Sequence, residues 1–222
     1  MAEVKSKEYE FQYDYGLAVI GSSINAYTVK ESIAELLANL QYLSNISDIS
    51  IIGIGHIILK VYEDVSNELS KTLREKGLSE ILVGGFCVIG KRIRVLRFFP
   101  KIEAHKVEYF FEEVLHEDGI RFWGSAKKIS EEIYKENDKL KPLQIVKMAI
   151  QSGKDNAIGG PLQSGGFYDE NFRISGVSDK VPSENGSTVV TKRYLRGFEL
   201  DQSKVTEEYP YLFVSYGYQP VD

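Results

Sequence analysis

Cysteine is nearly absent from this sequence, because Cys87 is the single cysteine among 222 residues. One cysteine cannot form an intrachain disulfide, which excludes a disulfide-stapled scaffold and is typical of a reducing compartment. Long apolar runs are also missing, since none approaches the ~18 residues that span a bilayer. The polar residues 1–8 do not resemble a signal peptide. We therefore expect a cytoplasmic protein with no membrane partner.

An excess of positive charge is the second absence. The chain has 27 Lys and Arg against 32 Asp and Glu, a formal net charge of -5. Binding to a phosphate backbone needs concentrated basic residues, so we expect no nucleic-acid partner. One basic stretch, residues 91–97, alternates charged and apolar residues and predicts the outward face of a strand, with an anion-binding patch as the alternative.

Residues that bind metals or cofactors are few. The chain has three histidines. His105, Glu112 and His116 could bind a metal, but a solvated acidic face around Glu112 explains them more simply. The two Gly-Gly pairs, at 84–85 and 159–160, lack the Lys and Ser/Thr of a phosphate-binding loop. We expect neither a metal nor a cofactor.

What the sequence does contain is typical of a globular α/β protein, with 43% hydrophobic residues, 14 Tyr and 11 Phe. Residues 8–14 alternate strictly and predict a half-buried strand, whereas the apolar run 17–20 predicts a strand covered on both faces. Two helical stripes follow. The first stripe is Val29, Ile33, Leu36, Leu37 and Leu40, and the second is Ile57, Ile58, Val61, Val65, Leu69 and Leu73.

The second half repeats this order. Residues 81–88 and 93–99 predict a hairpin, residues 106–114 fit either a strand or a helix, and residues 125–135 predict a helix. Pro142 marks the first turn of another helix. Short β-like pieces follow at 172–177, 187–200 and 206–218.

An order of strand pair, helix pair, strand pair and helix pair predicts a four-layer αββα sandwich of two antiparallel sheets. We expect residues 1–167 to form this domain and residues 168–222 to form a β-rich extension packed on it.

Four segments resemble the proteasome β-type branch of the N-terminal nucleophile (Ntn) hydrolases. Residues 15–23, YGLAVIGSS, resemble the buried strand that ends in glycine and opens the first helix of that family. Residues 81–86, ILVGGF, resemble its LLVGGY strand, and residues 124–125 resemble its GSG turn. Residues 155–161, DNAIGGP, resemble its RD…SGGPID loop. The four segments occur in the order and spacing of the family.

The resemblance implies a catalytic set. In this family an N-terminal threonine is the nucleophile, and a nearby lysine favours its reactive form; Lys7, fourteen positions before Gly21, is at the expected spacing. Gly21 would supply an oxyanion-hole N–H, and Ser125 and Asp155 would hold the threonine in hydrogen-bonding order. Each has a plainer interpretation: a surface lysine, a tight-turn glycine, a helix N-cap for Ser125 and a loop-capping aspartate for Asp155.

Two departures weaken the case for catalysis. Six residues precede Lys7, which leaves no room for the strand pair that carries the threonine, and Ile158 stands where the family has an active-site serine. Cleavage that exposes Ser22 or Ser125 would remove strands that the fold needs. Cys87, between apolar neighbours in a strand, is expected to be a small buried hydrophobe.

We therefore expect a non-catalytic or structural subunit, a pseudoenzyme, of a homo- or hetero-oligomer. An active threonine-type peptidase subunit whose nucleophile segment is missing from this chain is the main alternative. A peptide- or protein-binding module on the same fold is another.

Overall fold

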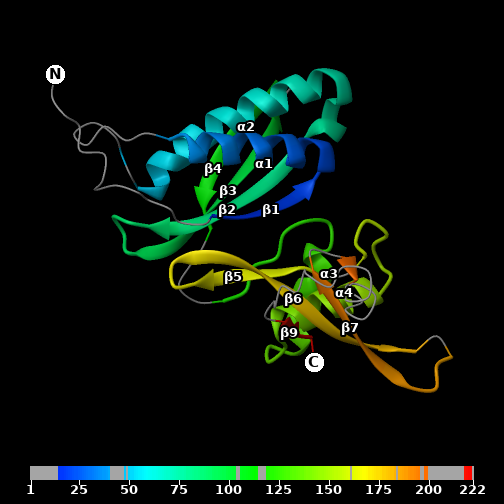
Figure 1. The fold of residues 1–222 in the computed structure, drawn as a ribbon. Helices are drawn as coiled ribbons and strands as arrows, with labels where there is room; N and C mark the ends of the chain where they lie inside the picture. Colours follow the sequence, from blue (N-terminus) through cyan, green and yellow to red (C-terminus); the bar gives the residue numbers. More distant parts are fainter. Residues whose placement is uncertain are drawn as a thin grey trace, which may run out of the picture. The chain divides into compact units, whose positions relative to one another are not determined.

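The computed structural model describes residues 15–40, 48, 50–103, 106–114, 119–160, 162–183, 185–195, 198–199 and 218–221. They form a mixed α/β protein with two mainly antiparallel sheets and four α-helices (Figure 1). The described residues form two compact units, the first made of those up to residue 114 together with 167–173 and the second of the other described residues from 119 onward. The predicted α/β class is confirmed. The stacking of one sheet on the other stays a prediction.

The first unit is built on a four-stranded antiparallel sheet in the order β1-β2-β3-β4. Its strands are β1 (Gly16–Gly21), β2 (Ser79–Cys87), β3 (Arg92–Glu103) and β4 (Lys106–Glu113). The predicted hairpin of residues 81–88 and 93–99 is confirmed, with Ile81 opposite Phe98. Residues 106–113 are a strand because Tyr109 and Phe111, on one side of the pleat, pack against the core.

Two helices lie side by side over one face of this sheet (Figure 1). They are α1 (Ser23–Ala38) and α2 (Ile51–Leu73), and a 3-10 turn, η1 (Arg74–Gly77), follows α2. Ser22 and Ser50 cap their N-termini by accepting hydrogen bonds from the N–H groups of Asn25 and Gly53, which lack partners within the helix. Both predicted helices are confirmed.

The buried face of α2 differs from the predicted stripe. It is centred on Ile54, Ile58, Tyr62 and Ser66, and Ile57 is exposed. The prediction counted apolar residues alone, whereas Tyr62 and Ser66 are buried because their hydroxyl groups have hydrogen-bond partners.

Strand β1 is also less covered than predicted. Ala18 and Val19 are exposed, and β1 stands at one end of the described sheet. The expectation of a strand buried on both faces is therefore wrong for its middle. Residues 8–14, the predicted partner strand of β1, lie outside the described residues.

Two glycines make room for aromatic rings on the sheet of the first unit. Gly16 and Gly84 are opposite each other in the β1–β2 register. A Cβ atom added at Gly16 would lie 2.4 Å from the ring of Phe172, and one added at Gly84 would lie 3.1 Å from the ring of Phe167. The two rings contact each other edge to face, with centroids 5.3 Å apart. The turn of residues 167–173 is thus packed directly on backbone.

The second unit contains α3 (Lys127–Glu136) and α4 (Pro142–Gln151), and Pro142 is in the first turn of α4 as predicted. The second sheet has the order β5-β6-β7-β8, with β9 parallel to β6. Its strands are β5 (Ser164–Tyr168), β6 (Asn171–Pro182), β7 (Val189–Leu195), β8 (Phe198–Glu199) and β9 (Tyr218–Pro220).

Strand β5 was missed by the sequence analysis, because its sequence, SGGFY, is rich in glycine and serine and is typical of a loop. The predicted boundary between the domain and its C-terminal extension, at residue 167, falls inside β5. The division of the chain into these two parts stays a prediction. Residues 206–217 lie outside the described residues. None of the described helices is long and apolar enough to cross a bilayer.

Candidate functional site

Gly21 lies at the end of β1, two residues before α1 begins. Its φ is +103°, and an added Cβ atom would lie 3.1 Å from the carbonyl oxygen of Leu78. Glycine is therefore required at this strand-to-helix junction for conformational and steric reasons. The junction itself is confirmed, whereas the oxyanion-hole role of Gly21 stays a prediction. Lys7 lies outside the described residues, so its role stays a prediction too.

A buried polar network lies at the start of α1. Asn25, with no exposed surface, donates hydrogen bonds from Nδ2 to Ser66 Oγ (3.0 Å) and to the Gly77 carbonyl (2.6 Å). Its Oδ1 accepts one from Ser79 Oγ at 2.7 Å, and Tyr62 donates to the Ser79 carbonyl. The network ties the first turn of α1 to α2 and β2. Sequence patterns did not reveal it, because its members come from four separate segments.

The structure brings Ser125 and Asp155 together, although 30 residues separate them in sequence. The pKa of the Asp155 carboxyl lies below its usual range. The main cause is a hydrogen bond from the Ala157 N–H to Asp155 Oδ1 (2.8 Å), and the Ser125 side chain makes the next largest contribution. The loop-capping interpretation of Asp155 is therefore realised alongside the contact with Ser125. The N-cap interpretation of Ser125 is not, because Ala126 is the cap residue of α3.

Ile158 lies in the same loop as Asp155. Its side chain is half-buried, and its backbone N–H bonds to the Asp155 carbonyl at 3.4 Å. An isoleucine side chain neither donates nor accepts a hydrogen bond. Position 158 therefore contributes a backbone group to this loop and no side-chain polar group.

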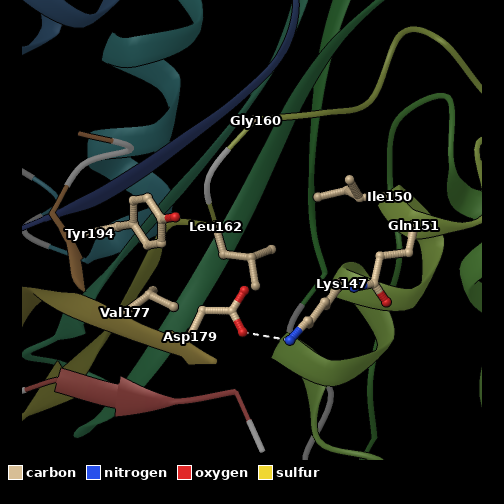
Figure 2. A pocket seen from close by; sticks show the side chains of 8 residues that line it. All are labelled: Lys147, Ile150, Gln151, Gly160, Leu162, Val177, Asp179 and Tyr194. Carbon is tan, nitrogen blue, oxygen red and sulfur yellow. Dashed lines mark hydrogen bonds and ion pairs between the residues drawn. The ribbon is translucent and has the colours of Figure 1, made fainter. Parts of the chain in front are cut away.

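A pocket of about 350 Å³ lies in the second unit, next to the loop that carries Asp155 (Figure 2). It is lined by Lys147, Ile150, Gln151, Gly160, Leu162, Val177, Asp179 and Tyr194. Lys147 of α4 forms an ion pair with Asp179 of β6, and their side chains are 25% and 15% exposed. Burial, then the Glu199 carboxylate, raises the pKa of the Tyr194 hydroxyl. Apolar walls with a few fixed polar groups are typical of a small-ligand site.

The other candidates have structural explanations. Glu113 pairs with Arg92 and Arg94, and Arg97 pairs with Glu80 and Glu112. The arginines of the basic stretch are thus neutralised rather than left as an anion patch. No three metal-binding side chains cluster among the described residues, a set that includes Glu112 but neither His105 nor His116.

Cys87 is 1% exposed, as predicted for a small buried hydrophobe. Burial raises the pKa of its thiol, but the backbone N–H groups of Ile51 and Gly90, together with Arg94, lower it below its usual range. Ile51 is at the N-terminus of α2, Gly90 is in the turn between β2 and β3, and Arg94 is in β3. The buried thiol is therefore held among polar groups rather than in a purely apolar environment.

Gly21 belongs to the first unit, and Ser125 and Asp155 belong to the second. The convergence of all three around one position therefore stays a prediction, while the approach of Ser125 to Asp155 is a feature of the structure.

No protein-family model matches this chain, and no curated protein sequence is similar to it. Among solved structures, the chain is similar to Anbu (ancestral beta-subunit) from Yersinia bercovieri. The two are 13% identical, the match covers 90% of this chain and 80% of that chain, and the TM-score is 0.43. The interpretation of the site therefore depends on the residues described above.

Proposed function

We propose that this chain is a proteasome-like protein of the Ntn-hydrolase fold that serves as a non-catalytic, structural subunit of an oligomeric assembly. The observation that carries the proposal is the loop of Asp155, in which the Ala157 N–H donates to Asp155 Oδ1 at 2.8 Å and the Ser125 side chain helps to lower the pKa of the carboxyl. The resemblance of segments 124–125 and 155–161 to the family requires these two side chains to meet.

The non-catalytic part of the proposal is based on Ile158. The family motif has a serine here, which can hydrogen-bond and take part in proton positioning. An isoleucine in its place removes that hydroxyl group from the loop of Asp155 while leaving the loop backbone bonded to Asp155. We infer that the loop is retained for its structure.

The assembly part is based on apolar side chains that the helices expose. Ile24 and Tyr27 of α1 are 57% and 69% exposed, and Val146 and Met148 of α4 are 40% and 43% exposed. Residues 24 and 27 are one turn apart, so their side chains are neighbours on the helix surface. Apolar neighbours on an outer helix are typical of a surface that another subunit covers.

Two measurements test this proposal. The 222-residue chain is incubated with a panel of fluorogenic peptides and with a threonine-directed covalent inhibitor, and neither turnover nor a mass shift is expected. Either signal would overturn the non-catalytic proposal in favour of a threonine-type peptidase subunit.

Native mass spectrometry then measures the assembly. We expect an oligomer that Tyr27→Lys weakens and that Thr72→Lys, at the exposed end of α2, leaves intact. A wild-type chain that is monomeric at all concentrations would contradict the structural-subunit role. It would instead favour the second candidate, a peptide-binding module, for which the pocket beside Lys147 and Asp179 is the supporting observation.

A further inference from the structure

A second pocket of the second unit combines aromatic rings with an excess of positive charge. Its volume is about 380 Å³, within the ~300–1,000 Å³ range of small-ligand sites. The segment before α3 and one face of α3 form it. Its lining residues are Ile120, Arg121, Phe122, Trp123, Lys127, Glu131, Tyr134 and Lys135.

The charge of this pocket is opposite in sign to the net charge of the chain. Three cations and one carboxylate line it, a local balance of +2, whereas the chain carries -5. Lys127 and Glu131 form a long ion pair of 3.9 Å with side chains 55% and 40% exposed, which is a weak contact. Arg121 and Lys135 form no ion pair within the part of the chain that the structure describes. Among the described residues, these two cations are therefore left to a ligand.

Aromatic side chains form the other part of the pocket lining. Phe122 and Tyr134 contact each other edge to face, with centroids 6.1 Å apart. Trp123 is half-buried and lines the pocket. Lys127, Glu131, Tyr134 and Lys135 recur at helical spacing, which places them on one side of α3. Aromatic side chains thus line the pocket beside Arg121 and Lys135.

We propose that this pocket binds an acidic peptide segment, with a carboxylate held by Arg121 and Lys135 and a neighbouring apolar or aromatic side chain packed against Trp123. A guanidinium group matches a carboxylate with two parallel hydrogen bonds, and an ammonium group adds a point charge. An aromatic wall beside these cations favours a ligand that carries an apolar group next to its charge. The proposal holds whether or not the chain is part of an assembly.

A single-stranded nucleic acid also combines anions with flat rings, but the observations favour a peptide. Nucleic-acid grooves track many phosphates, whereas this is one pocket with three cations, two of which have no ion pair among the described residues. The net charge of -5 would moreover repel an extended polyanion. The occupant that fits is a short segment with one or two carboxylates.

The test uses the fluorescence of Trp123, which is the chain's one tryptophan and lies in the pocket. Four N-acetylated dipeptides separate the possible carboxylates: glutamyl-phenylalanine acid, glutamyl-phenylalanine amide, glutaminyl-phenylalanine acid and glutaminyl-phenylalanine amide. We expect a saturable change with the doubly acidic probe and none with the neutral one. The two singly acidic probes show whether a side-chain or a C-terminal carboxylate is preferred. A deoxythymidine decamer tests whether the pocket binds a single-stranded nucleic acid instead.

Charge variants identify the residues. We expect Arg121→Gln and Lys135→Gln each to lower the affinity for the doubly acidic probe roughly tenfold or more, because each removes a charge-assisted hydrogen bond. Lys128→Gln, the same change on the same helix outside the pocket, is the control and is expected to have no effect. Circular dichroism verifies that each variant is folded, and raised salt is expected to weaken binding.

Three outcomes would overturn the proposal. No fluorescence change with any dipeptide at millimolar concentration means that no peptide site exists here. Equal affinity for the neutral and acidic probes means that the cations are not used. Stronger binding of the decamer than of every dipeptide assigns the pocket to nucleic acid instead.

Discussion

Phe172 lies directly over Gly16, so close that a Cβ atom at position 16 would be 2.4 Å from its ring. Phe167 lies over Gly84 in the same way, and Gly84 is the cross-strand partner of Gly16. The two glycines therefore leave space that two aromatic rings fill. In the first unit, the turn of residues 167–173 is fixed to the sheet by this contact.

Gly16→Ala tests the contact. The added methyl group overlaps the Phe172 ring, and overpacking of this kind costs about 1–3 kcal/mol. We expect a lower melting temperature by several degrees, measured by differential scanning calorimetry. Gly159→Ala is the control, since nothing lies within 4 Å of an added Cβ there. In the background of Phe172→Ala, the Gly16→Ala change is expected to cost much less, and equal cost in both backgrounds would contradict the contact.

The polar network at the start of α1 predicts a second stability effect. Asn25→Ala removes a side chain that makes three hydrogen bonds and leaves groups of Ser66, Gly77 and Ser79 buried without partners. Each unpaired buried group costs about 1–3 kcal/mol, so we expect a loss of about 3 kcal/mol in the free energy of unfolding. Urea denaturation measures it.

The control for Asn25 is Asn39→Ala, at the exposed C-terminus of α1, where the side chain bonds the Glu35 carbonyl. Its cost is expected to stay below about 1 kcal/mol. If the two variants were equally stable, the network would have no energetic weight.

The lowered pKa of Asp155 predicts a pH effect. The Ala157 N–H and the Ser125 hydroxyl favour the ionised carboxylate, so this contribution to stability is present above the pKa of the unfolded chain. It is lost as the pH falls through the lower pKa of the folded chain, below about pH 4.

Carbon-detected NMR titration measures this pKa directly. Ser125→Ala is expected to raise the pKa of Asp155 part of the way to its ordinary value, because the stronger bond from Ala157 remains. Ser152→Ala, in the same loop, is the control and is expected to leave it unchanged. An unchanged pKa in Ser125→Ala would mean that the two side chains do not interact.

The ion pair between Lys147 and Asp179 predicts a coupled pair of substitutions (Figure 2). Asp179→Asn leaves the Lys147 charge half-buried and unpaired, and we expect a loss of about 1–3 kcal/mol in the free energy of unfolding. Adding Lys147→Met is expected to restore part of that loss, because the unpaired charge is gone.

Asp64→Asn is the matched control, since its pair with Lys60 has side chains 68% and 61% exposed. Its expected cost is below about 1 kcal/mol. Purely additive effects of the two changes in the Lys147–Asp179 pair, measured by urea denaturation, would show that the ion pair does not couple them.

The sequence by itself determined the helices and most strands, because apolar spacing and caps are local properties. The stripe around Val29 and Ile33, the hairpin of Ile81 and Phe98, and the turn at Pro142 were all predicted correctly. The roles of Ser125 and Asp155 in one site come from family resemblance rather than from residue spacing, and they stay predictions.

Tertiary structure decided what local patterns leave open. Residues 106–113 fit the apolar spacing of both a strand and a helix. They form a strand because Phe98 of β3 stacks against Phe111, with ring centroids 5.4 Å apart. The glycine-rich β5 became a strand through pairing with β6. The Asn25 network and the pocket beside Lys147 and Asp179 join distant segments. Their chemistry depends on long-range packing, which no window of sequence contains.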